Sequence, residues 1–122
     1  MDINLLSPLT LSFVGDVYYS LLVRSRLAEV NRPVGELHSK SVKLVNAGAQ
    51  AKVFKYIEPM LTEKELLVYK RGRNAHAGHT PKNKSEAQYH KSTGFEALVG
   101  YLYLKKDFER LDFIFSEVLK NE

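Results

Sequence analysis

The chain has 122 residues, and 44% of them are hydrophobic, which suits one domain with one core over residues 1–122. It contains no cysteine, which excludes disulfides and thiolate metal sites. The acidic start MDIN does not read as a signal peptide, and Pro8, Gly15 and Asp16 interrupt the apolar run over residues 3–23. These features predict a cytoplasmic protein with no membrane association.

The net charge of +4 is unevenly distributed. Residues 64–91 carry seven lysines and arginines against two glutamates, a net charge of +5, so the rest of the chain is close to neutral. Concentrated positive charge indicates a polyanionic partner. A solvated loop rich in lysine is the other interpretation, and charge alone does not decide between the two.

Proline positions and apolar spacing predict two helices in the first half of the chain. Ser7 followed by Pro8 is typical of a helix start, and we expect this helix to reach about Glu29. The sequence Asn-Arg-Pro at 31–33 then breaks it. A second helix is expected from about residue 35 to residue 59, where apolar side chains recur at helical spacing.

Three further helices are predicted in the second half. The sequence TEKE at 62–65 resembles a capping box and starts a helix that runs into KRGRN. A polar loop follows over residues 74–85, and a fourth helix begins at Glu86 or later. Asp107 starts the last helix. Because strict strand alternation is absent, the sequence predicts an all-α domain.

Two of these helices each carry one acid in an apolar setting, where we expect it to be buried. Asp16 lies in FVGDVYY and Glu96 in TGFEALVGYLYL. Two neighbouring carboxylates repel each other, so a cation between them would be the natural compensation, and hard oxygen ligands favour Mg²⁺ or Mn²⁺. Alternatively, Asp16 pairs with Arg24 or Arg26, and Glu96 pairs with Lys91 or faces solvent.

Three motifs in order resemble one known family. FVGDVYY followed by LLVRSRL resembles the signature helix of the ribonuclease III catalytic domain, and FEALVGYLYL resembles its second acidic motif. KRGRNAHAGH matches the Mini-III ribonucleases, the bacterial subclass that consists of the catalytic domain without a double-stranded-RNA-binding domain. The resemblance covers essentially the whole chain and implies the helical bundle of a ribonuclease III endonuclease domain.

The resemblance implies roles for particular residues. Asp16 and Glu96 match the acids that bind metal and are needed for cleavage, with Mg²⁺ as the cofactor and Mn²⁺ as a possible substitute. Hydrolysis of a phosphodiester would leave a 5′-phosphate and a 3′-hydroxyl. Larger relatives carry additional acids in both motifs, whereas this sequence has Leu9, Ser12 and Thr93 at the matching positions. Mini-III proteins share the reduced set, so the number of metal ions stays open.

The basic stretch from residue 70 to residue 91 is predicted to bind RNA phosphates. A-form RNA is read mostly by shape, through phosphate and 2′-hydroxyl contacts. The family's substrate class is precursor 23S ribosomal RNA, with a ribosomal protein as a possible accessory. The candidate RNA-binding residues are Lys70, Arg71, Arg73, Asn74, Lys82 and Lys84. The histidines at 76, 79 and 90 are expected to contact RNA or solvent, and we do not expect a zinc site.

A homodimer is the predicted assembly. Leu9, Phe13 and Val17 recur every fourth residue and form an apolar stripe, and Phe13 matches the family's aromatic residue that inserts into the partner subunit. A two-fold dimer would also bring two acid pairs to the two strands of a duplex. Two other functions stay open: a non-catalytic RNA- or ribosome-binding module on the same fold, and a helical protein-interaction domain.

Overall fold

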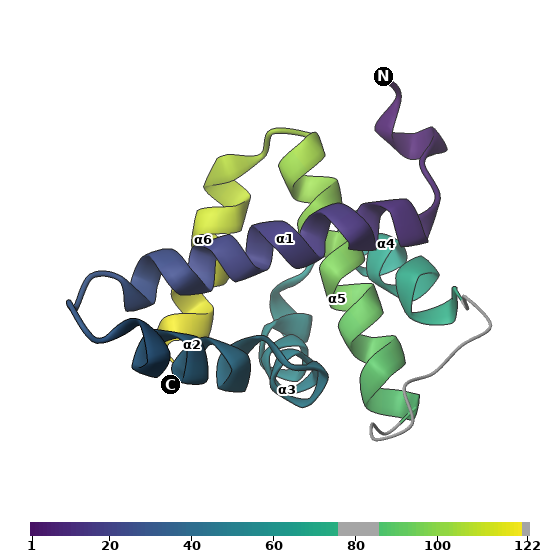
Figure 1. Ribbon diagram of the computed structural model, residues 1–122. Helices are drawn as coiled ribbons and strands as arrows, with labels where there is room; N and C mark the ends of the chain where they lie inside the picture. Colours follow the sequence, from purple (N-terminus) through teal and green to yellow (C-terminus); the bar gives the residue numbers. More distant parts are fainter. Residues whose placement is uncertain (76–85, 121–122) are drawn as a thin grey trace.

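The computed structural model describes residues 1–75 and 86–120, and these form helices without any strand, which confirms the predicted all-α class. A short 3₁₀ helix, η1, precedes the first long helix, and another, η2, lies between α3 and α4 (Figure 1). The elements are η1 (Ile3–Leu5), α1 (Pro8–Leu27), α2 (Val34–Val45), α3 (Ala47–Ile57), η2 (Glu58–Met60), α4 (Glu63–Asn74), α5 (Glu86–Leu104) and α6 (Phe108–Lys120).

The predicted helix starts are confirmed by their caps. Ser7 accepts a hydrogen bond from the Thr10 amide at 3.1 Å, and Pro8 occupies the first turn of α1. Thr62 and Glu65 form the expected capping box at the start of α4, with N···O distances of 3.1 and 2.9 Å. Each cap satisfies amide groups that a helix start would otherwise leave unpaired.

The prediction of one helix over residues 35–59 is wrong, because the chain breaks at Asn46. This residue has extended backbone angles, with φ −70° and ψ 164°, and its Oδ1 accepts from the Ala49 amide at 2.9 Å. Asparagine competes for helix backbone bonds in this way and therefore favours caps over helix interiors. The result is two helices, α2 and α3, in place of one, and η2 completes the connection to α4.

Helix α5 is the centre of the fold and packs against α1, α3 and α4. Figure 1 shows α1 crossing in front of α5. At the crossing, an added Cβ on Gly15 would overlap the Glu96 carbonyl oxygen, and one on Gly100 would overlap the Leu11 carbonyl oxygen. The two helices therefore touch backbone to backbone, which only glycine allows at these two positions.

The core is built around this helix from aromatic and aliphatic side chains. Phe95, Leu98 and Leu102 of α5 are almost fully buried. The rings of Phe54 and Tyr69 stack in parallel with centroids 3.5 Å apart, which joins α3 to α4. Burial of these side chains removes apolar surface from water and is the main stabilising contribution to the domain.

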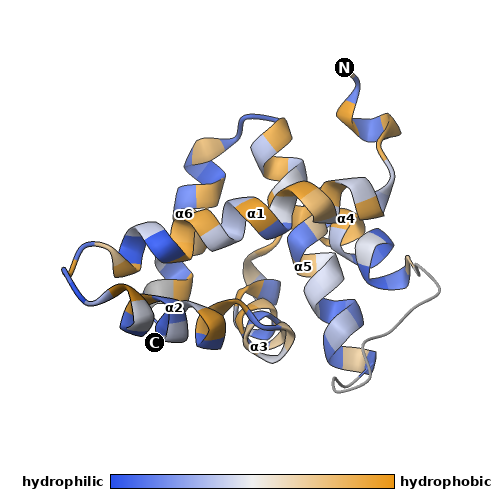
Figure 2. Ribbon diagram, in the orientation of Figure 1, coloured by the Kyte–Doolittle hydropathy of each residue, from blue (hydrophilic) through white to orange (hydrophobic). Residues whose placement is uncertain are grey.

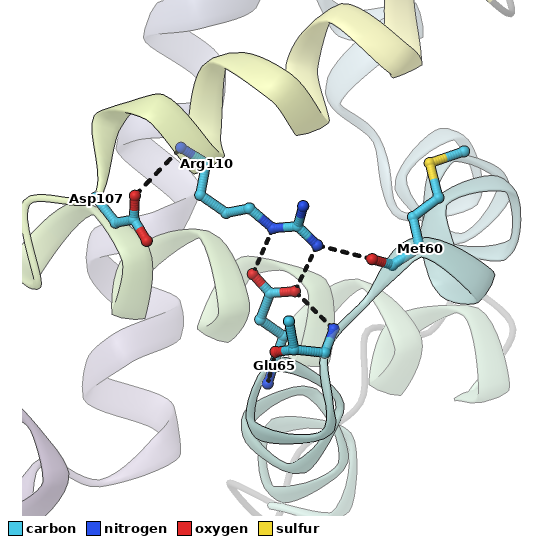
Figure 3. Close-up of polar contacts among 5 residues, drawn as sticks. Met60, Glu65, Asp107 and Arg110 are labelled. Atoms are coloured by element: carbon cyan, nitrogen blue, oxygen red, sulfur yellow. Dashed lines mark hydrogen bonds and ion pairs between the residues drawn. The ribbon is translucent and has the colours of Figure 1, made fainter.

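A polar clamp, formed by Glu65 and Arg110, attaches α6 to the rest of the domain (Figure 3). The Arg110 Nε and Nη2 donate to the two Glu65 carboxylate oxygens at 2.7 and 2.8 Å, and Nη2 also donates to the Met60 carbonyl at 2.7 Å. Burial alone would raise the pKa of Glu65, but the hydrogen bonds from Arg110 and Thr62 outweigh it and lower that pKa. Glu65 is therefore held ionised in a bidentate pair.

In the described part of the chain, none of the helices has the length and hydrophobicity that a bilayer span requires.

Candidate active site

The two predicted acids lie together at the crossing of α1 and α5. Gly15, next to Asp16 in the chain, lies against the Glu96 backbone, which brings the two carboxyl groups within hydrogen-bonding reach. Glu96 is half-buried, whereas Asp16 is exposed in the single chain. The expectation that Asp16 is buried is wrong, because this part of α1 turns an outer face to solvent.

Donors from two other positions hold the Glu96 carboxylate. Ser12 Oγ donates to Oε1 at 3.3 Å, and Gln50 Nε2 donates to Oε2 at 3.1 Å. Ser12 comes from α1 and Gln50 from α3, so three helices meet at one carboxylate. Ser12 is one of the positions where larger relatives are expected to carry an acid, and here it supplies a hydrogen-bond donor.

The closeness of the two carboxyl groups affects the pKa of Glu96. Burial raises the pKa of Glu96 to about 8, helped by the hydrogen bond that its protonated carboxyl group donates to Asp16 and by the negative charge of Asp16. The hydrogen bonds from Gln50 and Ser12 act in the opposite direction but do not offset it. Glu96 therefore retains its proton at neutral pH, and a divalent cation would replace that proton.

The alternative pairings of these acids are not found among residues 1–75 and 86–120. Arg26 pairs with Glu29 at 3.0 Å, and no ion pair there joins Asp16 to an arginine. Glu96 bonds to Ser12 and Gln50, and Lys91 is exposed. The acids are thus directed to each other, as the metal-site hypothesis requires.

The donor set fits a hard divalent cation. Carboxylate oxygens are the ligands of Mg²⁺, which binds through one or two carboxylates and fills its octahedron with water and substrate phosphate. Across the described residues no third histidine, aspartate or glutamate joins the pair into a larger ligand cluster. Asp16 and Glu96 are therefore the residues that would hold such a cation.

The basic end of α4 packs against the part of α5 that carries Glu96. A Cβ on Gly72, in the middle of KRGRN, would come within 2.7 Å of the Ala97 side chain and 2.9 Å of the Gly94 Cα. The absence of a side chain thus lets this end of α4 pack against the part of α5 that carries Glu96. Lys70, Arg71 and Asn74 are exposed there.

Arg73 differs from the other predicted RNA contacts, because it is half-buried and has partners in the chain. Its guanidinium lies over the Tyr69 ring, 5.7 Å from the centroid, and its Nε donates to Asn74 Oδ1 at 3.1 Å. These contacts fix the orientation of the guanidinium and of the Asn74 amide.

Several predicted residues fall outside the described part of the chain. Lys82 and Lys84 of the basic loop do so, as do His76 and His79. His90 is described: it is half-buried, and its Nε2 lies 3.5 Å from Glu86 Oε1.

Gln50 and Gly72 are site residues that the sequence reasoning missed. Gln50 occupies an inward position of α3, where Ala47, Phe54 and Ile57 supply apolar side chains. A polar residue in such a series is the signal that could have identified it, because a buried amide needs partners. Gly72 has no comparable signal, since its role depends on how α4 packs against α5.

The predicted apolar stripe of α1 is exposed in the single chain. Phe13 is 77% exposed and Val17 is 66% exposed, and Leu9 and Leu21 continue the same face. Figure 2 shows hydrophobic bands along the side of α1 that faces the viewer. Asp16 is exposed between Phe13 and Val17. Contiguous exposed apolar residues are typical of an interaction surface.

We expect the metal-free protein to lose stability as the pH rises toward 8. Glu96 has an ordinary pKa near 4.5 and a folded-state pKa of about 8, so the folded chain binds more protons between these values. The contribution is complete below the lower pKa and is lost as the pH rises through the higher one, with a slope of at most about 1.4 kcal/mol per pH unit.

Urea unfolding in EDTA, at about pH 5.5 and about pH 8.5, measures this slope. Glu96→Gln keeps the shape of the protonated acid and removes its titration, so the variant should show a flatter dependence on pH. Identical pH dependence in the two proteins would contradict the raised pKa.

Comparison with known proteins places this geometry in a class. A model of the ribonuclease III domain matches residues 9–107, a range that includes Asp16, Glu96 and the basic end of α4. The structure is similar to the crystal structure of a protein from Fusobacterium nucleatum, with a TM-score of 0.89 and 29% sequence identity over 98% of this chain and 97% of that one. The fold is that of a ribonuclease III domain.

Two curated relatives identify the family within this class. Mini-ribonuclease 3 of Thermoanaerobacter sp. is 50% identical over 87% of this chain and 75% of that protein. Mini-ribonuclease 3 of Symbiobacterium thermophilum is 48% identical over 94% of this chain and 86% of that protein. The chain belongs to the Mini-ribonuclease 3 family, and it is an endoribonuclease.

Proposed function

We propose that this protein is a Mg²⁺-dependent endoribonuclease that cuts double-stranded RNA, acting as one catalytic domain over residues 1–122. The observation that carries the proposal is the Asp16–Glu96 pair, in which two carboxyl groups meet at the part of α5 against which the basic end of α4 packs. A module that only binds RNA would have no use for an acid pair that raises the pKa of Glu96 to about 8. A protein-interaction domain would not need the basic stretch.

Each part of the site has a task in phosphodiester hydrolysis. Asp16 and Glu96 would hold Mg²⁺, which lowers the pKa of water and neutralises charge on the leaving oxygen when bound. Ser12 fixes the orientation of the Glu96 carboxylate. Lys70 and Arg71, exposed at the end of α4, would supply cations for RNA phosphates. The products would carry a 5′-phosphate and a 3′-hydroxyl.

The substrate we propose is precursor 23S ribosomal RNA, trimmed near its ends in the cytoplasm, with a ribosomal protein as a possible accessory. Incubation of the protein with a duplex from those ends, with and without Mg²⁺ or Mn²⁺, tests the activity. Cleavage that needs the metal and leaves 5′-phosphates supports it. Metal-independent cleavage, or binding without any cleavage, would contradict it.

The exposed stripe on α1 supports a two-fold homodimer with Phe13 at its interface. We expect Phe13→Glu to weaken association strongly, because it places a charge on an apolar surface and, in a two-fold dimer, opposes it to its own copy. Phe13 is largely exposed in the single chain, so the fold should survive. Sedimentation velocity of the wild type and the variant measures the effect.

Leu67→Glu is a matched control for this experiment. Leu67 is also an exposed apolar residue, but it lies on α4 and not on the α1 stripe. The control should sediment as the wild type does. A wild-type protein that is monomeric at assay concentrations and fully active would contradict the dimer.

If the loop that carries Lys82 and Lys84 binds RNA phosphates, the RNA affinity should depend on the salt concentration. Replacing Lys82 and Lys84 together by glutamine should weaken RNA binding and reduce the slope of log affinity against log salt by about one unit, or somewhat less, for each phosphate that is no longer bound. A control variant, Lys105→Gln with Lys106→Asn, alters two lysines at the opposite end of α5. Asparagine is chosen for residue 106 because it tolerates the positive φ of 64° there. Equal salt slopes in wild type and loop variant would exclude a role for the loop.

A further inference from the structure

Gln50 is a buried amide whose hydrogen bonds lead directly to the proposed metal ligand. Its side chain is 2% exposed on the inward face of α3. Nε2 donates one hydrogen bond to the Val45 carbonyl at 2.9 Å and the other to Glu96 Oε2 at 3.1 Å. Both donors of the amide are therefore used, and one of them binds the Glu96 carboxylate.

The Glu96 carboxylate has about four acceptor positions. Gln50 takes one on Oε2, and Ser12 takes one on Oε1 at the longer distance of 3.3 Å. Because the two donors come from different helices, they restrict rotation of the carboxylate and leave its other positions for Asp16 or a cation. A carboxylate fixed in this way loses less entropy when it binds a metal ion.

The other end of the Gln50 amide argues against a purely structural role. Its Oε1 is buried and has no hydrogen-bond partner among the described residues. A buried acceptor without a partner is unfavourable for folding, and methionine would fill a similar volume without that cost. Stability alone therefore does not account for a glutamine at this position, whereas orientation of Glu96 does.

We propose that Gln50 is a positioning residue for catalysis, which fixes the Glu96 carboxylate in the orientation that binds the divalent cation. The inference rests on the proposed function, since it requires Glu96 to be a metal ligand. Residues that orient metal ligands in this way typically contribute 10- to 100-fold to metal affinity or activity.

The test is Gln50→Met, read out by direct Mn²⁺ binding and by cleavage. Electron paramagnetic resonance titration without RNA should show Mn²⁺ affinity reduced by about 10- to 100-fold. The Mg²⁺ concentration for half-maximal cleavage should rise by a similar factor, and excess Mg²⁺ should restore much of the rate. Thermal unfolding should stay close to that of the wild type, because removal of the unpaired buried acceptor offsets the loss of the hydrogen bond to the Val45 carbonyl.

Asn46→Ala is the matched structural control. Asn46 bonds to the Ala49 amide and to the Val42 and Lys43 carbonyls, so its loss loosens the same α2–α3 junction without removing a hydrogen bond to Glu96. This variant should unfold at a lower temperature and keep wild-type Mn²⁺ affinity. Equal loss of Mn²⁺ affinity in both variants would assign Gln50 a structural role and overturn the proposal.

Two further variants separate this inference from the proposed function. If Asp16→Asn and Glu96→Gln lose Mn²⁺ binding while Gln50→Met keeps wild-type affinity and metal dependence, the positioning role is wrong and the metal site stands. If Asp16→Asn and Glu96→Gln themselves bind Mn²⁺ and cleave normally, the proposed site is wrong, and the inference fails with it.

Discussion

Asp16→Asn should abolish cleavage, with a loss larger than the 10- to 100-fold effect typical of residues that only orient a metal ligand. The substitution keeps the size of the side chain but removes the negative charge that would bind the cation. Asp16 is exposed, so the fold should be retained. RNA affinity should be largely preserved, since the phosphate contacts are expected on α4 and the following loop.

Initial cleavage rates on a labelled duplex, with RNA binding measured in parallel, check this expectation. Glu109→Gln is a suitable control, because Glu109 is an exposed acid on α6, away from the α1–α5 crossing. The control should cleave as the wild type does. A folded Asp16→Asn protein with near-normal cleavage would remove the mechanism proposed here.

Alanine at the helix crossing should have the largest effect on stability. In Gly100→Ala the new Cβ would meet the Leu11 carbonyl group and lie 3.0 Å from the Gly15 amide nitrogen. Both contacts are with backbone atoms, which cannot rotate away, so α1 and α5 would have to separate. We expect destabilisation at the upper end of about 1–3 kcal/mol or beyond it, out of a total of about 5–15 kcal/mol. Separation of these helices would also move Asp16 away from Glu96, so activity should fall as well.

Gly35→Ala provides the comparison for that experiment. Gly35 lies in α2, and no neighbouring atom lies within 4 Å of its added Cβ. Alanine forms helices better than glycine, so this variant should be as stable as the wild type or up to about 1 kcal/mol more stable. Urea unfolding of the three proteins measures both effects. Equal stability of Gly100→Ala and wild type would show that the crossing is looser than the structure indicates.

Local signals in the sequence were sufficient for most of the fold. The caps at Ser7 and Thr62 and the start at Glu86 were predictable because each depends on a few neighbouring residues. The break at Asn46 was missed because apolar spacing continues across it and only its cap geometry reveals the turn. The acid pair could be predicted as a hypothesis, since each acid is isolated in an apolar helix.

The surroundings of the acid pair depend on tertiary packing, which the sequence does not display. Gln50 is 46 residues from Glu96 in the chain, and no local pattern connects the two. The backbone contact at Gly15 and the packing of Gly72 against α5 likewise require the relative placement of helices. The exposure of Asp16 was predicted wrongly for the same reason: an apolar neighbourhood in sequence is not a buried position in space.

The clamp between Glu65 and Arg110 affects how α6 and the start of α4 unfold locally. One carboxylate both caps the start of α4 and holds α6, and the same guanidinium binds the carbonyl at the end of η2. Release of α6 would leave Glu65 half-satisfied and buried, which is unfavourable. Hydrogen exchange in α6 and in the first turn of α4 should therefore proceed through one shared opening event, and α6 should not fray independently.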